Sequence, residues 1–157
     1  NHKLSEEARL LKSEIIEVIK KAALEREVAI TSDNFGTFLE NFQMNINLQV
    51  FSMAMDKLFE WIGQNEIGPM NIIMSYLSRQ QHAGLQHYYK KLIELQFHGL
   101  MVCFEFQVNG TGSQTFEAPF LVDFISTCQG VCFYQNGKVF IILPAKRIRV
   151  EQAVRRA

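Results

Sequence analysis

The side chains best suited to metal binding or nucleophilic chemistry are three cysteines, Cys103, Cys128 and Cys132, and His98. Thiolate and imidazole groups bind zinc when they recur at short, regular spacings. Here His98 and Cys103 are five residues apart, Cys128 and Cys132 are four apart, and the sequence has no Cys-x-x-Cys pair. A free cysteine in an apolar stretch is usually a small core residue. We therefore expect no metal site.

An enzyme would need a nucleophile or an acid and base pair that the fold can bring together. Asp123 precedes Cys128 by five residues, but the sequence has no glycine-rich phosphate loop and no Gly-x-Ser-x-Gly motif. His82 and His87 are also five residues apart, so they point to different sides of a helix. We expect no catalytic residue and no cofactor, and hence a non-enzymatic protein.

A second set of polar and basic residues could contact nucleic acid. Glutamine and histidine can donate hydrogen bonds to base edges, whereas lysine and arginine suit phosphates. The candidate nucleic-acid-binding residues are Arg79, Gln81, His82, Gln86, His87, Lys90, Lys91, Lys146, Arg147 and Arg149.

The elements that would position most of these residues lie between Trp61 and Val108. Gly68-Pro69 is a typical helix start, and it predicts a short helix from Met70 to Leu77. A polar turn over residues 78–84 leads to a second predicted helix over residues 85–98, which Gly99 ends. An apolar strand over residues 100–108 then forms a hairpin with residues 114–118 through a glycine-rich turn.

This order of elements, with the ending LIELQFHGLMV, resembles a winged helix-turn-helix over about residues 55–118. The resemblance is to the superfamily and to no particular family within it. It implies that the helix from Leu85 lies in the major groove of double-stranded DNA and that residues 109–113 form the wing.

The charge of this surface argues for a different partner. Phosphate neutralisation supplies most of the affinity of a DNA-binding protein, yet only Arg79, Lys90 and Lys91 are basic here. Six methionines also cluster in the centre of the chain, and their flexible side chains suit adaptable protein surfaces as well as cores. We expect a DNA-binding regulator or accessory factor, with a protein-interaction adaptor or assembly factor as the alternative.

Residues 1–30 predict a long helix that begins at Ser5. Its apolar residues form two neighbouring rows, one with heptad spacing and one beside it. The helix either packs on its own domain or pairs two copies into a homodimer. The rows are Leu4, Ala8, Leu11, Ile15, Val18 and Ala22, and then Ile16, Ile19 and Ala23.

Local signals predict the remaining elements. We expect a polar break at residues 31–34, helices over 34–42 and 48–63, and a short helix or strand over 120–128. Asn136-Gly137 lies between two apolar runs, residues 131–135 and 138–143, which predicts a hairpin with a type I′ turn. Pro144 should end this hairpin, and residues 147–156 predict a basic terminal helix.

The size of the chain, 157 residues, predicts one α+β domain with a winged-helix-like core. Within it, residues 48–118 would form the helix-turn-helix and wing, and residues 119–157 the second hairpin and the terminal helix. The formal net charge is zero, although five basic residues against one acidic residue leave +4 on residues 145–157. The odd number of cysteines and the lack of a signal-like or membrane-spanning stretch predict a cytoplasmic protein.

Overall fold

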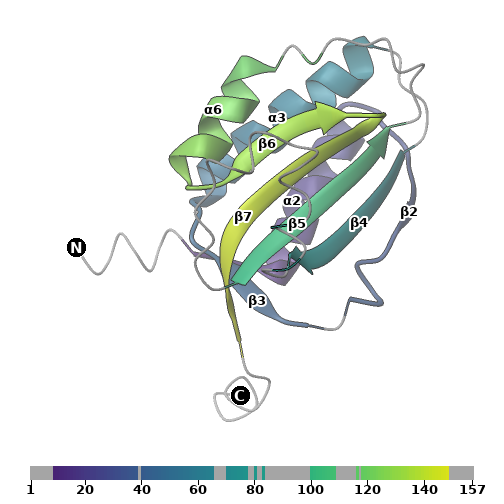
Figure 1. Cartoon of the computed structure of the whole chain (residues 1–157). Helices are drawn as coiled ribbons and strands as arrows, with labels where there is room; N and C mark the ends of the chain where they lie inside the picture. Colours follow the sequence, from purple (N-terminus) through teal and green to yellow (C-terminus); the bar gives the residue numbers. More distant parts are fainter. Residues whose placement is uncertain are drawn as a thin grey trace.

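A computed structural model describes residues 9–38, 40–65, 70–77, 80, 83, 100–108, 116 and 118–148. Over these residues the chain is α+β, with three helices packed on one face of a curved sheet (Figure 1). None of the described helices is long and apolar enough to cross a membrane. The helices are α2 (Lys12–Glu25), α3 (Leu48–Gln64) and α6 (Pro119–Thr127).

The described strands form one sheet in the order β1-β3-β7-β5-β4-β2, with β6 paired to β7 beside β3. All neighbours are antiparallel except β2 and β4, which are parallel. The strands are β1 (Leu10–Leu11), β2 (Ile30–Asp33), β3 (Phe42–Met44), β4 (Met70–Leu77), β5 (Leu100–Val108), β6 (Val131–Gln135) and β7 (Lys138–Arg147).

The helix predicted for Met70 to Leu77 is wrong, because these residues form strand β4. Met70, Ile72 and Met74 are fully buried on the helix-covered face, while Ile73 points to the other face and is 38% exposed. This alternation has the period of a strand. The described residues therefore contain no helix-turn-helix at this position, and the second predicted helix, over 85–98, lies outside the described residues.

The hairpin predicted between residues 100–108 and 114–118 is also wrong. Strand β5 does form over Leu100–Val108, but β4 occupies one of its edges and β7 the other. No edge of β5 is left for residues 114–118. The proposed wing over residues 109–113 lies outside the described residues.

The hairpin around Asn136-Gly137 is confirmed. Asn136 has φ of 52° and Gly137 has φ of 74°, and two positive φ angles are what a type I′ turn requires. Strand β7 continues past Pro144 to Arg147, because β3 pairs with Ala145, Lys146 and Arg147. The predicted terminal helix is therefore wrong at its start, and residues 149–157 lie outside the described ones.

The N-terminal helix is shorter than predicted. Leu10 and Leu11 form β1, so helix α2 begins at Lys12 and not at Ser5. Ile15 and Ala22 from the heptad row and Ile19 and Ala23 from the neighbouring row are buried within this chain. Packing on its own domain, one of the two predicted alternatives, is thus confirmed for these four residues.

The polar break at 31–34 and the helix predicted over 34–42 are both wrong. Ile30–Asp33 is strand β2, and only a hydrogen-bonded turn follows it, in which Thr37 and Phe38 donate to the Asn34 carbonyl. The Asn34 side chain pairs with the backbone of β4: its Nδ2 donates to Met74 O at 2.8 Å and its Oδ1 accepts from Met74 N at 2.7 Å. The parallel edge of the sheet thus continues through a side chain.

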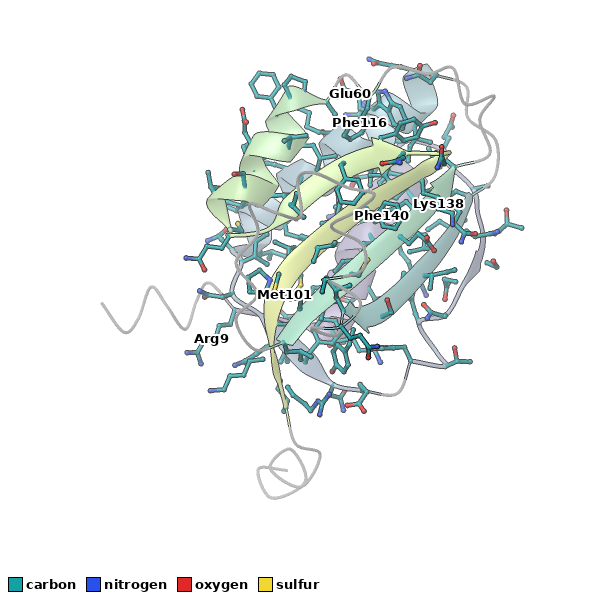
Figure 2. All side chains as sticks on the ribbon, in the orientation of Figure 1. Arg9, Glu60, Met101, Phe116, Lys138 and Phe140 are labelled. Atoms are coloured by element: carbon teal, nitrogen blue, oxygen red, sulfur yellow. The ribbon has the colours of Figure 1, made fainter. Side chains whose placement is uncertain are left out.

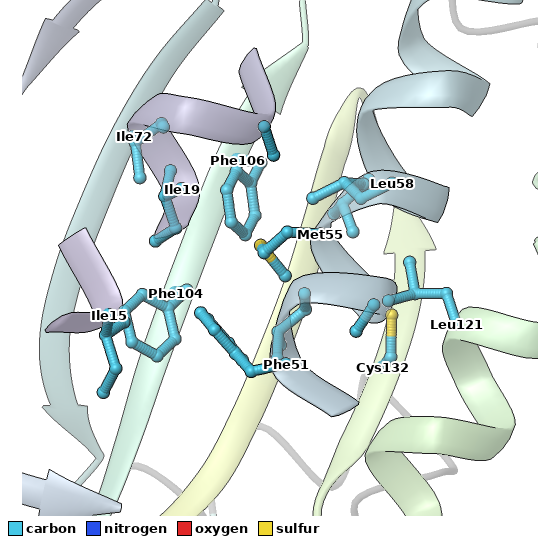
Figure 3. Close-up of a cluster of buried hydrophobic side chains, with 14 of the residues drawn as sticks. Ile15, Ile19, Phe51, Met55, Leu58, Ile72, Phe104, Phe106, Leu121 and Cys132 are labelled. Carbon is cyan, nitrogen blue, oxygen red and sulfur yellow. The ribbon is translucent and has the colours of Figure 1, made fainter. Parts of the chain in front are cut away.

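Helix α3 confirms the prediction for residues 48–63 and supplies the centre of the core. Asn47 caps it by accepting from Gln49 N and Val50 N. Figure 3 shows side chains of α2, α3 and α6 meeting side chains of β4, β5 and β6. Burying one large apolar side chain contributes about 1.5–3 kcal/mol. The labelled core residues are Ile15, Ile19, Phe51, Met55, Leu58, Ile72, Phe104, Phe106, Leu121 and Cys132.

The opposite face of the sheet changes from apolar to polar along its length. At one end a second buried cluster contains Leu77, Met101, Cys103, Phe133 and Ile142. At the other end Lys138 pairs with Glu105 at 3.3 Å across β5 and β7. Met101, Phe140 and Lys138 mark the course of this face in Figure 2.

Candidate functional site

A groove of about 490 Å³ runs between α2 and α3. Its walls follow from helical periodicity, because Glu14, Val18, Lys21 and Glu25 fall on one stripe of α2, beside the buried row. The facing wall on α3 contains Leu48, Ser52, Met53 and Asp56, and Glu17 and Ala22 complete the lining.

The groove combines apolar surface with an acidic rim. Leu48 is 47% exposed and Met53 is 51% exposed, and both are among the large hydrophobic side chains that are exposed on the described part of the chain. Four carboxylates and one lysine line the same groove, and one of these carboxylates, Asp56, is paired with Arg26, so the rim keeps a net negative charge of two when Arg26 is counted. Apolar side chains flanked by charge of one sign are typical of a surface that binds another molecule.

An ion-pair network that includes Asp56 of the groove lies beside the C-terminal end of α2. Arg26 Nη2 lies 2.8 Å from Asp56 Oδ1 and 3.0 Å from Oδ2, and Arg26 Nε lies 3.0 Å from Oδ1. The same guanidinium reaches Glu60 at 3.4 Å, and Lys57 lies 3.6 Å from that carboxylate. The hydrogen bond to Asp56 raises the pKa of Arg26. Asp56 is thus a carboxylate that already holds a guanidinium in two-pronged geometry.

Two of the predicted nucleic-acid-binding residues lie in strand β7. Arg147 is 3.6 Å from Glu40, and its guanidinium carbon lies 5.1 Å from the ring centre of Tyr76. Lys146 lines a shallow hollow of about 270 Å³ with Arg9. In Figure 2 Arg9 lies well apart from Glu60, which contacts Arg26, and the basic hollow and the acidic groove share no lining residue.

The other predicted nucleic-acid-binding residues lie outside the described residues. They are Arg79, Gln81, His82, Gln86, His87, Lys90, Lys91 and Arg149.

The described cysteines do not converge. Cys103 is paired with Ile142 of β7, and Cys132 is paired with Ile141. Because consecutive residues of a strand point to opposite faces of the sheet, the two thiols lie on opposite faces. Burial raises the pKa of Cys103 to about 12, which keeps its thiol protonated and unreactive at neutral pH. Cys128 is half-buried after the end of α6, and burial raises its pKa as well.

The sequence analysis missed the groove. It identified the apolar rows of the first helix but assigned no function to the stripe of Glu14, Lys21 and Glu25 beside them. The sequence feature that could have indicated the groove is this stripe of charged residues at helical spacing around Val18, which is half-buried. The facing wall is contributed by α3, and local sequence gives no means of pairing the two helices.

Comparison with known protein families and with curated protein sequences finds no match. Among solved structures, a mycobacterial sensor histidine kinase, MprB, matches with a TM-score of 0.51. The match covers 89% of this chain and 98% of that chain, at 9% sequence identity. At this identity the similarity shows a shared fold and carries no residue-by-residue correspondence.

Proposed function

We propose that this chain is a non-enzymatic binding module that recognises a basic amphipathic segment of a partner protein. The observation that carries the proposal is the groove between α2 and α3, in which Leu48 and Met53 are exposed beneath an acidic rim. A helix with leucines on one face and basic residues on its flanks matches both features. Helix-in-groove binding of this kind uses apolar anchors for affinity and charge for orientation.

A protein partner fits the described surface better than DNA does. The carboxylates of the groove would repel phosphates, and strand β4 replaces the first helix on which the winged helix-turn-helix depended. Arg147, one of the residues proposed to contact DNA, is paired with Glu40. The alternative of an adaptor or assembly factor is therefore the one that we carry forward.

The test is a titration of the protein into a fluorescein-labelled helical peptide with leucines on one face and arginines on the flanks of that face. We expect binding that raises the fluorescence anisotropy, and no binding of a peptide with the same leucines and glutamates in place of the arginines. Glu25→Lys, on the rim, should weaken binding about tenfold through its reversed charge. Asp123→Lys makes the same charge change on the exposed surface of α6 and should leave the affinity unchanged.

A random DNA duplex titrated in parallel separates the two classes of partner. Binding of the duplex without binding of the basic peptide would overturn the proposal and favour a nucleic-acid role. Equal loss of peptide binding in both lysine variants would show that the groove is not the site.

A second candidate function, in phosphotransfer signalling, rests on the fold shared with a sensor histidine kinase. A kinase draws its phosphoryl group from a nucleoside triphosphate, so this candidate requires nucleotide binding. The measurement is titration with a fluorescent ATP analogue in the presence of Mg²⁺. Saturable binding that unlabelled ATP reverses would favour this candidate over a purely protein-binding role.

A further inference from the structure

The groove ends at a carboxylate that is already engaged by an arginine of the same chain. Asp56 lines the groove and accepts hydrogen bonds from two nitrogens of Arg26. Glu60 lies behind it and contacts the same guanidinium. Arg26 directly follows helix α2, and it reaches across to α3 from the edge of the groove.

Resting on the proposed function, we infer that Arg26 occupies the position of a partner arginine and competes with the partner for Asp56. Binding then exchanges one guanidinium for another: the partner's arginine takes the two-pronged contact with Asp56, and Arg26 swings into solvent. Arg26 would be an internal competitor that lowers the affinity of the groove and selects partners with a basic residue at this end.

The exposure of the pair makes this exchange feasible. The Arg26 side chain is 38% exposed and the Asp56 side chain 42% exposed. Exposed ion pairs contribute little to stability, because water and salt screen them. Displacing Arg26 therefore leaves the helices packed by their buried rows, in which Ile19 and Leu58 are fully buried.

The geometry also specifies arginine over lysine. A carboxylate that accepts two parallel N–H groups matches the planar fork of a guanidinium, whereas an ammonium group offers a point charge. Glu60 adds a second acceptor on the same side. A partner lysine would gain the attraction of the rim without the paired hydrogen bonds.

The experiment measures the affinity of the arginine peptide and of a lysine version of it for matched variants. Arg26→Gln removes the competitor, and it should tighten binding of the arginine peptide by about two- to fivefold, the range that one exposed ion pair allows. Arg9→Gln makes the same change at a residue that neither lines the groove nor contacts Asp56, and it should leave the affinity unchanged. Thermal unfolding followed by circular dichroism checks that each variant is folded.

The double variant Arg26→Gln with Asp56→Asn separates competition from a general effect of charge. If Arg26 acts by occupying Asp56, its removal gives no gain once Asp56 cannot hold a guanidinium, and the two changes are non-additive. A gain of the same size in the Asp56→Asn background would overturn the inference. So would equal affinities of the wild type and Arg26→Gln, with the proposed function left standing, whereas failure of every variant to bind the peptide would overturn both.

Discussion

At the scale of single residues, burial of the Cys103 thiol, on the sheet face opposite the described helices, makes the stability of the protein depend on pH. Its thiol has a pKa of about 12 in the folded protein, against about 8.5 in an unfolded chain. The unfolded state loses this proton first, so the stabilising difference is complete below about pH 8.5 and is lost as pH rises toward 12, by about 1.4 kcal/mol per pH unit.

We therefore expect the free energy of unfolding of the wild type to fall more steeply in alkali than that of Cys103→Val. The measurement is urea unfolding at several pH values from neutral to about pH 11, the span over which only the unfolded thiol is ionised. Comparing the two slopes cancels the contributions of tyrosines and lysines, which both proteins share. Parallel slopes would show that Cys103 is not shielded from water.

Gly130 is constrained by a backbone contact. A Cβ atom at this position would lie 2.4 Å from the carbonyl oxygen of Ile142 and 2.7 Å from Leu143 Cδ2. Gly130→Ala should cost about 1–3 kcal/mol, because the hairpin of β6 and β7 must shift to admit a methyl group. Gly63→Ala is the matched control: nothing lies within 4 Å of its Cβ, and helix α3 should gain about 0.5–1 kcal/mol.

Chemical denaturation of both glycine variants decides the point. The prediction is a loss of stability for Gly130→Ala and a gain for Gly63→Ala. Two losses of similar size would mean that the contact with Ile142 is not what distinguishes them.

At the scale of elements, α3 depends on its cap. The Asn47 side-chain oxygen accepts from Gln49 N at 2.7 Å and from Val50 N at 3.4 Å. Asn47→Ala leaves these amides without that acceptor and should destabilise the protein by about 1 kcal/mol. Asn47→Asp keeps the acceptor and places a negative charge at the positive end of the helix, so its stability should match the wild type. The measurement is thermal unfolding of the two variants and the wild type. Equal losses of stability in Asn47→Ala and Asn47→Asp would contradict a capping role.

The sequence predicted those elements whose signals are local. Helix α3 was predicted within one residue because its apolar stripe repeats at helical spacing from Phe51 to Ile62, and the β6–β7 hairpin because Asn136-Gly137 favours one turn type. Strand β4 was missed because Ile72, Ile73, Tyr76 and Leu77 also fit a helix. Pairing with β5, which lies far along the chain, selects the strand.

The groove could not be predicted from the sequence for the same reason. Its residues come from α2 and α3, which two strands separate along the chain, and each stripe alone resembles the solvated side of a helix. The candidate site predicted from sequence instead depended on residues 70–98 forming two helices. Once the first of these is a strand, the predicted site loses the geometry that would have gathered its residues.

At the scale of the whole molecule, charge is separated although the sum is zero. The lining of the groove carries excess negative charge, while Arg9 and Lys146 line a separate hollow that shares no residue with it. A chain with zero net charge exerts little long-range attraction. Attraction of a basic partner must then act locally, within about 10 Å at moderate ionic strength.

Pairing of two copies through the N-terminal helix stays a prediction at this scale. Four of the seven described residues in its two apolar rows, Ile15, Ile19, Ala22 and Ala23, are buried in the core of one chain, whereas Leu11 is 44% exposed. Sedimentation velocity at micromolar concentration measures the oligomeric state, and a single monomer peak would contradict the dimer.

The salt dependence of peptide binding measures how much of the affinity comes from charge and how much from apolar contact. Added salt screens the rim carboxylates, whose surroundings are largely solvent, but it leaves burial of Leu48 and Met53 intact. We expect the dissociation constant of the arginine peptide to rise with salt up to a few tenths molar and then level off. Glu25→Lys should start weaker and show a shallower rise, since less attraction remains to be screened. The plateau separates this mechanism from its alternatives: continued loss without a plateau would mean that charge alone holds the peptide, and no response to salt would mean that the carboxylates take no part in binding.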